Sequence, residues 1–168
     1  LAAALRAPDQ VASLVLAEPP LHRWACATEA GALLCRAFVA GVWRAAAEAF
    51  GLGQQRRAMQ LLTDGMWGRP VFESWPNDRI DAVMHNAAAM HALTRSHDPF
   101  PEFDRSAVAG LTMPTLLLRG GHTSALHRHV MNEMGSVMRH ARHVEIPLAG
   151  HGLPGDDPIG FNAAVVPF

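Results

Sequence analysis

The sequence has almost no net charge. Its 14 basic and 15 acidic residues give a formal charge of −1, and the pI is near 6.9. Every basic residue is an arginine, and we draw no functional conclusion from that composition. A chain without an excess of basic residues lacks the electrostatic footprint of a protein that binds nucleic acid or an anionic membrane. We therefore predict neither a nucleic-acid partner nor a membrane partner.

Long apolar runs and cysteines are scarce as well. Arg, Glu or Gly interrupts each apolar run before it reaches membrane-spanning length. The only cysteines, Cys26 and Cys35, lie nine positions apart in an alanine-rich stretch and match no metal-binding motif, which predicts buried free thiols in a reducing compartment. No signal peptide is visible, but the chain starts at Leu1 within an expected helix, so we expect the true N-terminus to lie outside it. Cytoplasmic is the default localisation.

The residues that are present favour a soluble α/β protein with one core. Apolar residues make up 49% of the 168 positions and charged residues 17%. Short apolar runs predict strands, and helical spacing of apolar residues fills most of the chain between the first two of them. The predicted strands span 11–17, 114–119 and 143–147. The alternation of strands and helices predicts a partial parallel sheet, with core segments 1–20 and 106–168 and an all-helical insertion at 21–105.

Three polar residues follow the predicted strands. Glu18 ends the first strand, Thr123 lies just past the second, and His151 follows the third. Ligands and catalytic groups gather outside the carboxyl ends of parallel strands, so these side chains should converge. A carboxylate that orients an imidazole, which then deprotonates a nucleophile, needs this kind of convergence. We predict that the Glu18 carboxylate lies within hydrogen-bond reach of His151.

Three segments of the chain form a pattern with a family resemblance: VASLVLAEPPL, LTMPTLLLRGG and HVEIPLAGHGLPGDDPIGFNAAVVPF. Together with the helical stretch between the first two, they resemble the second half of an α/β-hydrolase over nearly the whole chain. The segment around Gly150-His151-Gly152 resembles the histidine loop of that family, and the helical insertion resembles its lid. The loop after the second strand has no carboxylate, where family members commonly carry the catalytic Asp. Glu18 instead matches an alternative position for the acid, so the resemblance implies His151 as general base and Glu18 as the acid that orients it.

One part of the family pattern is missing. No Gly-x-Ser-x-Gly motif occurs in the chain, and the resemblance would place that motif just before Leu1. We therefore expect residues 1–168 alone to be inactive and poorly soluble. For the parent protein, the resemblance implies a hydrolase of an ester, or of another acyl or carbon–carbon bond, in a small apolar substrate, without cofactor or metal. Two alternatives stay open: a dehalogenase-like enzyme with an Asp nucleophile, and a non-catalytic small-molecule receptor on the same fold.

Other conspicuous side chains have simpler interpretations. Trp43 and Trp67 are candidates to line a substrate pocket, although the core of the lid would accommodate them equally well. Asp156 and Asp157 should cap the last helix. Solvent exposure, and not metal binding, is expected for the three neighbouring histidines His122, His127 and His129.

Overall fold

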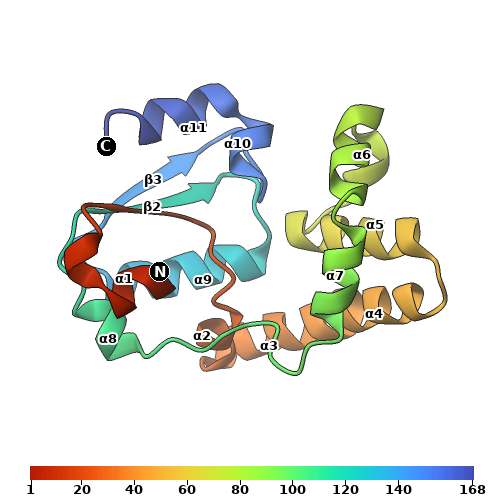
Figure 1. Ribbon diagram of the computed structural model, residues 1–168, viewed down its shortest axis with the longest axis horizontal. Coiled ribbons are helices and arrows are strands. Elements are labelled where there is room, and N and C mark those ends of the chain that lie inside the picture. Colours follow the sequence, from red (N-terminus) through yellow and green to blue (C-terminus); the bar gives the residue numbers. More distant parts are fainter.

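The protein is a mixed α/β structure with a three-stranded parallel sheet. The computed structural model describes all residues from Leu1 to Phe168 (Figure 1). The strands are β1 (Leu14–Ala17), β2 (Thr115–Gly120) and β3 (Arg142–Ile146), in the spatial order β1-β2-β3. Both pairings are parallel, with Leu16 opposite Leu117 and Leu118 opposite Val144. The prediction of three parallel strands is confirmed, and their limits lie within three residues of the expected ones.

The central strand explains why the sheet forms here. β2 carries the apolar run Leu116–Leu118, and neighbouring strands and helices bury it on both faces. Successive side chains on a strand point to opposite faces. Leu116 and Leu118 join a small core with Ile146, whereas Leu117 joins the main core. In β1, an edge strand with a single neighbouring strand, only Leu16 is buried.

Helices cover both faces of the sheet and form a separate group beside it. α11 lies over one face, and α1, α8 and α9 lie over the other, while the helices between β1 and α8 extend to one side (Figure 1). The helices around the sheet are α1 (Ala2–Arg6), η1 (Pro8–Gln10), α8 (Arg105–Ala109), α9 (Ala125–Val137), α10 (Leu153–Asp156) and α11 (Pro158–Val165). The helices between β1 and α8 are α2 (His22–Cys26), α3 (Glu29–Phe38), η2 (Val39–Trp43), α4 (Arg44–Gly51), α5 (Gln55–Trp67), η3 (Phe72–Ser74), α6 (Asn77–Met84) and α7 (Ala87–Thr94). We call this second group the lid helices; α2 and α3 also pack on α9, so the division into core and lid stays an interpretation.

α3, η2 and α4 form one continuous helix. It spans 23 residues, Glu29–Gly51, and by length and composition alone it could cross a membrane. The core helix of a soluble protein meets the same criteria. This helix packs against α2, α5 and α9.

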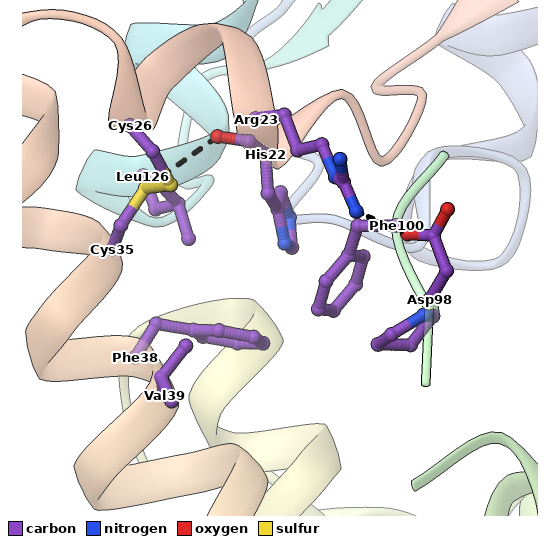
Figure 2. A pocket seen from close by; sticks show the side chains of 10 residues that line it. His22, Arg23, Cys26, Cys35, Phe38, Val39, Asp98, Phe100 and Leu126 are labelled. Atoms are coloured by element: carbon purple, nitrogen blue, oxygen red, sulfur yellow. Dashed lines mark hydrogen bonds and ion pairs between the residues drawn. A yellow bond between two sulfur atoms is a disulfide. The ribbon is translucent and has the colours of Figure 1, made fainter. Parts of the chain in front are cut away.

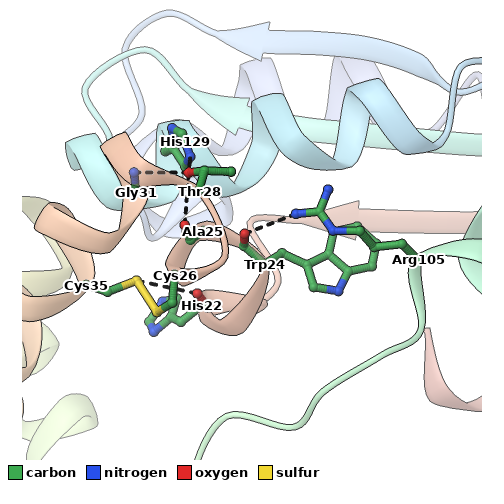
Figure 3. The surroundings of a disulfide bond; sticks show 9 residues. All are labelled: His22, Trp24, Ala25, Cys26, Thr28, Gly31, Cys35, Arg105 and His129. Carbon is green, nitrogen blue, oxygen red and sulfur yellow. Dashed lines mark hydrogen bonds between the residues drawn. A yellow bond between two sulfur atoms is a disulfide. The ribbon is translucent and has the colours of Figure 1, made fainter.

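Cys26 and Cys35 form a disulfide that joins α2 to α3 (Figure 3). The prediction of free thiols is therefore wrong. Thr28 begins α3 by accepting a hydrogen bond from the Gly31 N–H, and the chain turns between the two helices just before it. That turn brings the two Cα atoms to 5.7 Å. The cytoplasmic assignment rested partly on free thiols and stays a prediction, now without that support.

Candidate active site

Glu18 is a buried carboxylate at the end of β1. Its residue is 2% exposed, and its φ of 44° is the only positive value at a non-glycine residue. Three donors converge on the carboxylate: the Gly120 N–H on Oε1 at 2.8 Å, and the Thr123 hydroxyl and His151 Nδ1 on Oε2 at 2.7 and 2.9 Å. The predicted contact between Glu18 and His151 is confirmed. A left-handed backbone at a glutamate costs conformational energy, and the surrounding hydrogen bonds hold it in place.

Thr123 also lies at this carboxylate. The loop after β2, where the family resemblance would place an acid, supplies a hydroxyl donor to Glu18 instead. The carboxyl ends of β1 and β2 and the loop after β3 therefore meet at one carboxylate. This is the convergence that parallel strands predict.

His151 has a defined tautomer because its partner is an acceptor. An ionised carboxylate can only accept hydrogen bonds, so Nδ1 carries the proton toward Glu18. In the neutral ring Nε2 is then the unprotonated nitrogen, which is the one that can accept a proton. Nε2 forms no hydrogen bond with the chain. The arrangement is that of a general base oriented by a carboxylate.

Two rings flank His151. Trp67, at the end of α5, presents its ring at 87° to the imidazole with centroids 5.6 Å apart, while His127 stacks on it at 4.1 Å and 22°. The prediction that Trp67 lines the site is consistent with this contact. Trp43 packs with Phe100 at 4.8 Å and is buried in the main core, with no ring contact to His151. The structure therefore brings Trp67 to the site and leaves Trp43 among the lid helices.

Glycines in the histidine loop and in the segments packed against it allow this close packing. A Cβ on Gly120 would collide with the Gly150 carbonyl, and a Cβ on Gly150 would collide with the Trp67 ring. Gly68 adopts φ 70° and ends α5 immediately after Trp67. Glycine is the residue that accepts this left-handed conformation without strain.

His127 is buried, contrary to the prediction of solvent exposure. It is 2% exposed, because α9 is covered by the sheet on one side and by α2 and α3 on the other. Its Nδ1 hydrogen-bonds the Ser124 hydroxyl at 2.8 Å. Burial, together with the nearby His151 and His22, lowers the pKa of His127 to about 2. His129 is half-buried and pairs with the Thr28 hydroxyl (Figure 3), so only His122 is exposed as expected.

His22 continues this row of imidazoles. Its ring lies 5.4 Å from that of His127. Burial, and to a smaller extent the nearby His151, lowers the pKa of His22 to about 4. Both His22 and His127 are therefore neutral at physiological pH. His151 is the only member of the row with a carboxylate partner.

Asp156 connects the histidine loop to the lid helices. Its Oδ2 accepts hydrogen bonds from the Gly150 N–H at 2.8 Å and the Trp67 Nε1–H at 2.9 Å, and its Oδ1 pairs with Arg79. The prediction that Asp156 caps the last helix is wrong, since these three donors use its oxygens. Asp157 does cap α11, by accepting from the Gly160 N–H.

Glu18, His127 and His151 are close enough to be considered as metal ligands, with one potential ligand atom from each within 4.8 Å of the others. The ring planes argue against it. A metal lies near the plane of each imidazole that binds it, and the planes of two stacked rings inclined by 22° do not meet near the site. Both Glu18 oxygens also hold donors already. Without ring rotation these residues do not fit a metal.

No hydroxyl or thiol of this chain forms a hydrogen bond with His151, so the site has no nucleophile of its own. Ser124, in the loop after β2, is 8% exposed, binds His127 and caps α9. Sequence reasoning missed His22, His127 and Asp156 as neighbours of the site. Only Asp156 carried a usable signal, its position five residues after His151. The periodicity of the sequence does not show which histidines become buried, because that depends on how the helices fold over the sheet.

No known family model matches the chain, and neither the curated proteins nor the solved structures that were compared with it give a match.

Proposed function

We propose that this chain is the part of an α/β-hydrolase-type enzyme that carries the general base and its orienting acid. The observation that supports it most is the buried Glu18 carboxylate, 2.9 Å from His151 Nδ1, where the three parallel strands end. In this proposal the nucleophile belongs to a segment outside residues 1–168. The chain alone is then inactive.

The chemistry that these residues can perform is proton transfer. His151 Nε2 takes the proton of the nucleophilic hydroxyl as its oxygen attacks the acyl carbon of a small ester. The imidazolium passes this proton to the leaving alcohol, and the acyl group stays on the nucleophile. A water molecule then repeats the sequence, which releases the acid and restores the enzyme. Glu18 stabilises the imidazolium and holds its orientation, a role that a carboxylate fills without becoming protonated itself.

The experiment uses the protein that contains this chain, purified whole, with p-nitrophenyl acetate as substrate. We expect His151→Ala to lower turnover by about 10²–10⁴-fold, the usual contribution of a general base. The matched control is His122→Ala, which removes an exposed histidine from the loop after β2. A serine-reactive phosphonate should label the wild type and label His151→Ala far more slowly. Turnover of His151→Ala within tenfold of the control would remove the general-base role.

A second candidate is a non-catalytic receptor on the same fold. It is favoured by the way in which Asp156 holds Trp67 and Arg79 against the histidine loop, since a closed lid suits ligand retention. The same phosphonate labelling separates the two. A receptor would show neither labelling nor turnover.

A further inference from the structure

A small cavity lies between α2, α3, the start of α9 and the loop that precedes α8. Its volume is about 120 Å³. The apolar side chains of Phe38, Val39, Phe100 and Leu126 help to line it, and the disulfide of Cys26 and Cys35 forms part of the wall (Figure 2). None of these residues makes a hydrogen bond or ring contact with Glu18 or His151. The cavity is therefore separate from the proposed catalytic pair.

His22 is the polar group of this cavity. Its ring points into the space beside Phe38 and Phe100, with centroid distances of 5.1 and 4.3 Å (Figure 2). The residue is 5% exposed, and neither ring nitrogen has a hydrogen-bond partner. Buried polar atoms in folded proteins are almost always hydrogen-bonded, because leaving them unpaired is unfavourable. The unpaired ring beside the cavity points to a ligand that supplies the partner, with a turn of the ring that brings a nitrogen to the cavity surface.

The size and charge of the cavity restrict that ligand. An apolar cavity of about 150 Å³ in another protein holds one benzene molecule, so this one is sized for a single ring. Arg23 borders the cavity but is already paired with Asp98 at 2.6 Å and Glu102 at 3.2 Å. Asp98 lines the cavity too, and two carboxylates beside one guanidinium leave no net positive charge to receive an anionic group. The ligand should be neutral.

We propose that this cavity binds a small neutral hydroxyaromatic compound of the phenol class, with its ring against Phe38 and Phe100 and its hydroxyl on His22. A neutral imidazole offers one donor and one acceptor nitrogen, and which nitrogen faces the cavity does not matter for a hydroxyl, which can both donate and accept. A carbonyl could pair only with the N–H and an amine chiefly with the bare nitrogen. The hydroxyl is therefore the group that fits either tautomer of His22.

Binding is tested by titrating the protein with phenol, benzene and benzoate by isothermal calorimetry. We expect the wild type to bind phenol more tightly than benzene by about two- to tenfold, the range for one neutral hydrogen bond. Benzoate should bind more weakly than phenol. His22→Phe keeps a ring of similar shape but no nitrogen, so it should bind benzene and lose the preference for phenol. His22→Gln, which keeps a hydrogen-bonding group, should retain part of that preference.

Two further measurements make the result decisive. Phenol should shift the ring ¹⁵N resonances of His22 in the wild type, which reports the contact even if a His22 variant does not fold. His151→Ala should bind phenol as the wild type does, so a failure of the hydrolase proposal leaves this one intact. Equal affinity for phenol and benzene, tighter binding of benzoate, or no binding of any of the three would overturn the proposal.

Discussion

Replacing Glu18 by glutamine gives a result that can be worked out from the three donors around its carboxylate. The amide has one oxygen and one NH₂ group, and these can be placed in two ways. If the oxygen takes the place of Oε2, it accepts from Thr123 and His151, but the NH₂ then faces the buried Gly120 N–H. An unpaired buried N–H costs about 1–3 kcal/mol.

The reverse placement avoids that cost and changes the histidine. The amide oxygen then accepts from Gly120, and the NH₂ faces the Thr123 hydroxyl, which can rotate to accept, and His151 Nδ1. Nδ1 can accept only if its proton moves to Nε2, which removes the basic nitrogen from the catalytic position. Because the first placement is about 1–3 kcal/mol less favourable, we expect the second to dominate by roughly five- to 150-fold.

The expected outcome for Glu18→Gln is therefore a large loss of turnover with a small loss of stability. A comparable wrong-tautomer substitution in a serine protease costs about 10⁴ in kcat, and we expect a loss of that order here. Ring ¹⁵N spectra should show the His151 proton on Nε2 in place of Nδ1. The control is Glu73→Gln, which removes a carboxylate that pairs with Arg56 at the surface. The orienting role would be refuted if the Glu18→Gln protein kept the His151 proton on Nδ1 and its turnover stayed within tenfold of the control.

Three other predictions follow from the buried groups around the site. The lowered pKa values of His22 and His127 keep both neutral in the folded protein, whereas the histidines of the unfolded chain bind protons near pH 6.5. The free energy of unfolding should therefore fall as the pH drops from 6.5 toward 4, by about 1.4 kcal/mol per pH unit for each histidine. Urea unfolding at pH 7 and pH 5 measures this change. Asp156→Asn should lower the free energy of unfolding by about 1–3 kcal/mol, since a partly buried, charged hydrogen-bond acceptor is lost, and it should speed hydrogen exchange at the Trp67 indole. Replacing both Cys26 and Cys35 by serine should cost about 2–3 kcal/mol, as expected for closing a loop of nine residues, measured by urea unfolding.

Each of these predictions has a control or an outcome that contradicts it. For the acid effect, His22→Phe should remove the share of His22 from the slope between pH 6.5 and 4, and an unchanged slope would mean that His22 is not buried. For Asp156, the control is Asp157→Asn, whose amide oxygen can still cap α11. For the disulfide, a reducing agent should destabilise the wild type and leave the double serine variant unchanged; equal sensitivity would show that the bond does not form.

The sheet and the Glu18–His151 pair could be predicted because both follow from strand ends. An apolar run such as Leu116–Leu118 defines a buried parallel strand, and parallel strands bring their carboxyl ends to one edge. The resemblance to α/β-hydrolases implied an acid either in the loop after β2, which has no carboxylate, or at the end of β1, where Glu18 lies. That topology brings the two residues together, and the left-handed backbone of Glu18 and its other hydrogen bonds, which the sequence does not show, complete the contact at 2.9 Å.

The disulfide could not be predicted, because the sequence around it reads as one continuous helix. Residues nine apart in an α-helix are separated by about 13 Å along its axis, too far for a disulfide. The turn before Thr28 folds α2 back on α3 and reduces the Cα separation of Cys26 and Cys35 to 5.7 Å. The burial of His127 escaped prediction for a related reason. Whether a side of α9 faces solvent depends on how α2 and α3 fold over it, and their own periodicity does not show that.

The row of three histidines also explains which of them can act as a base. His22 and His127 are buried without a carboxylate, and a positive charge on His151 lowers the pKa of both, so neither competes for a proton near neutral pH. His151 alone has an anionic partner, and its ring stacks on a neutral neighbour that does not repel the imidazolium. A second charged imidazole at 4.1 Å would oppose the proton transfer that the proposed mechanism requires. The burial of His127 therefore supports the same step as Glu18: His127 stays neutral beside the imidazolium, and Glu18 accepts its hydrogen bond.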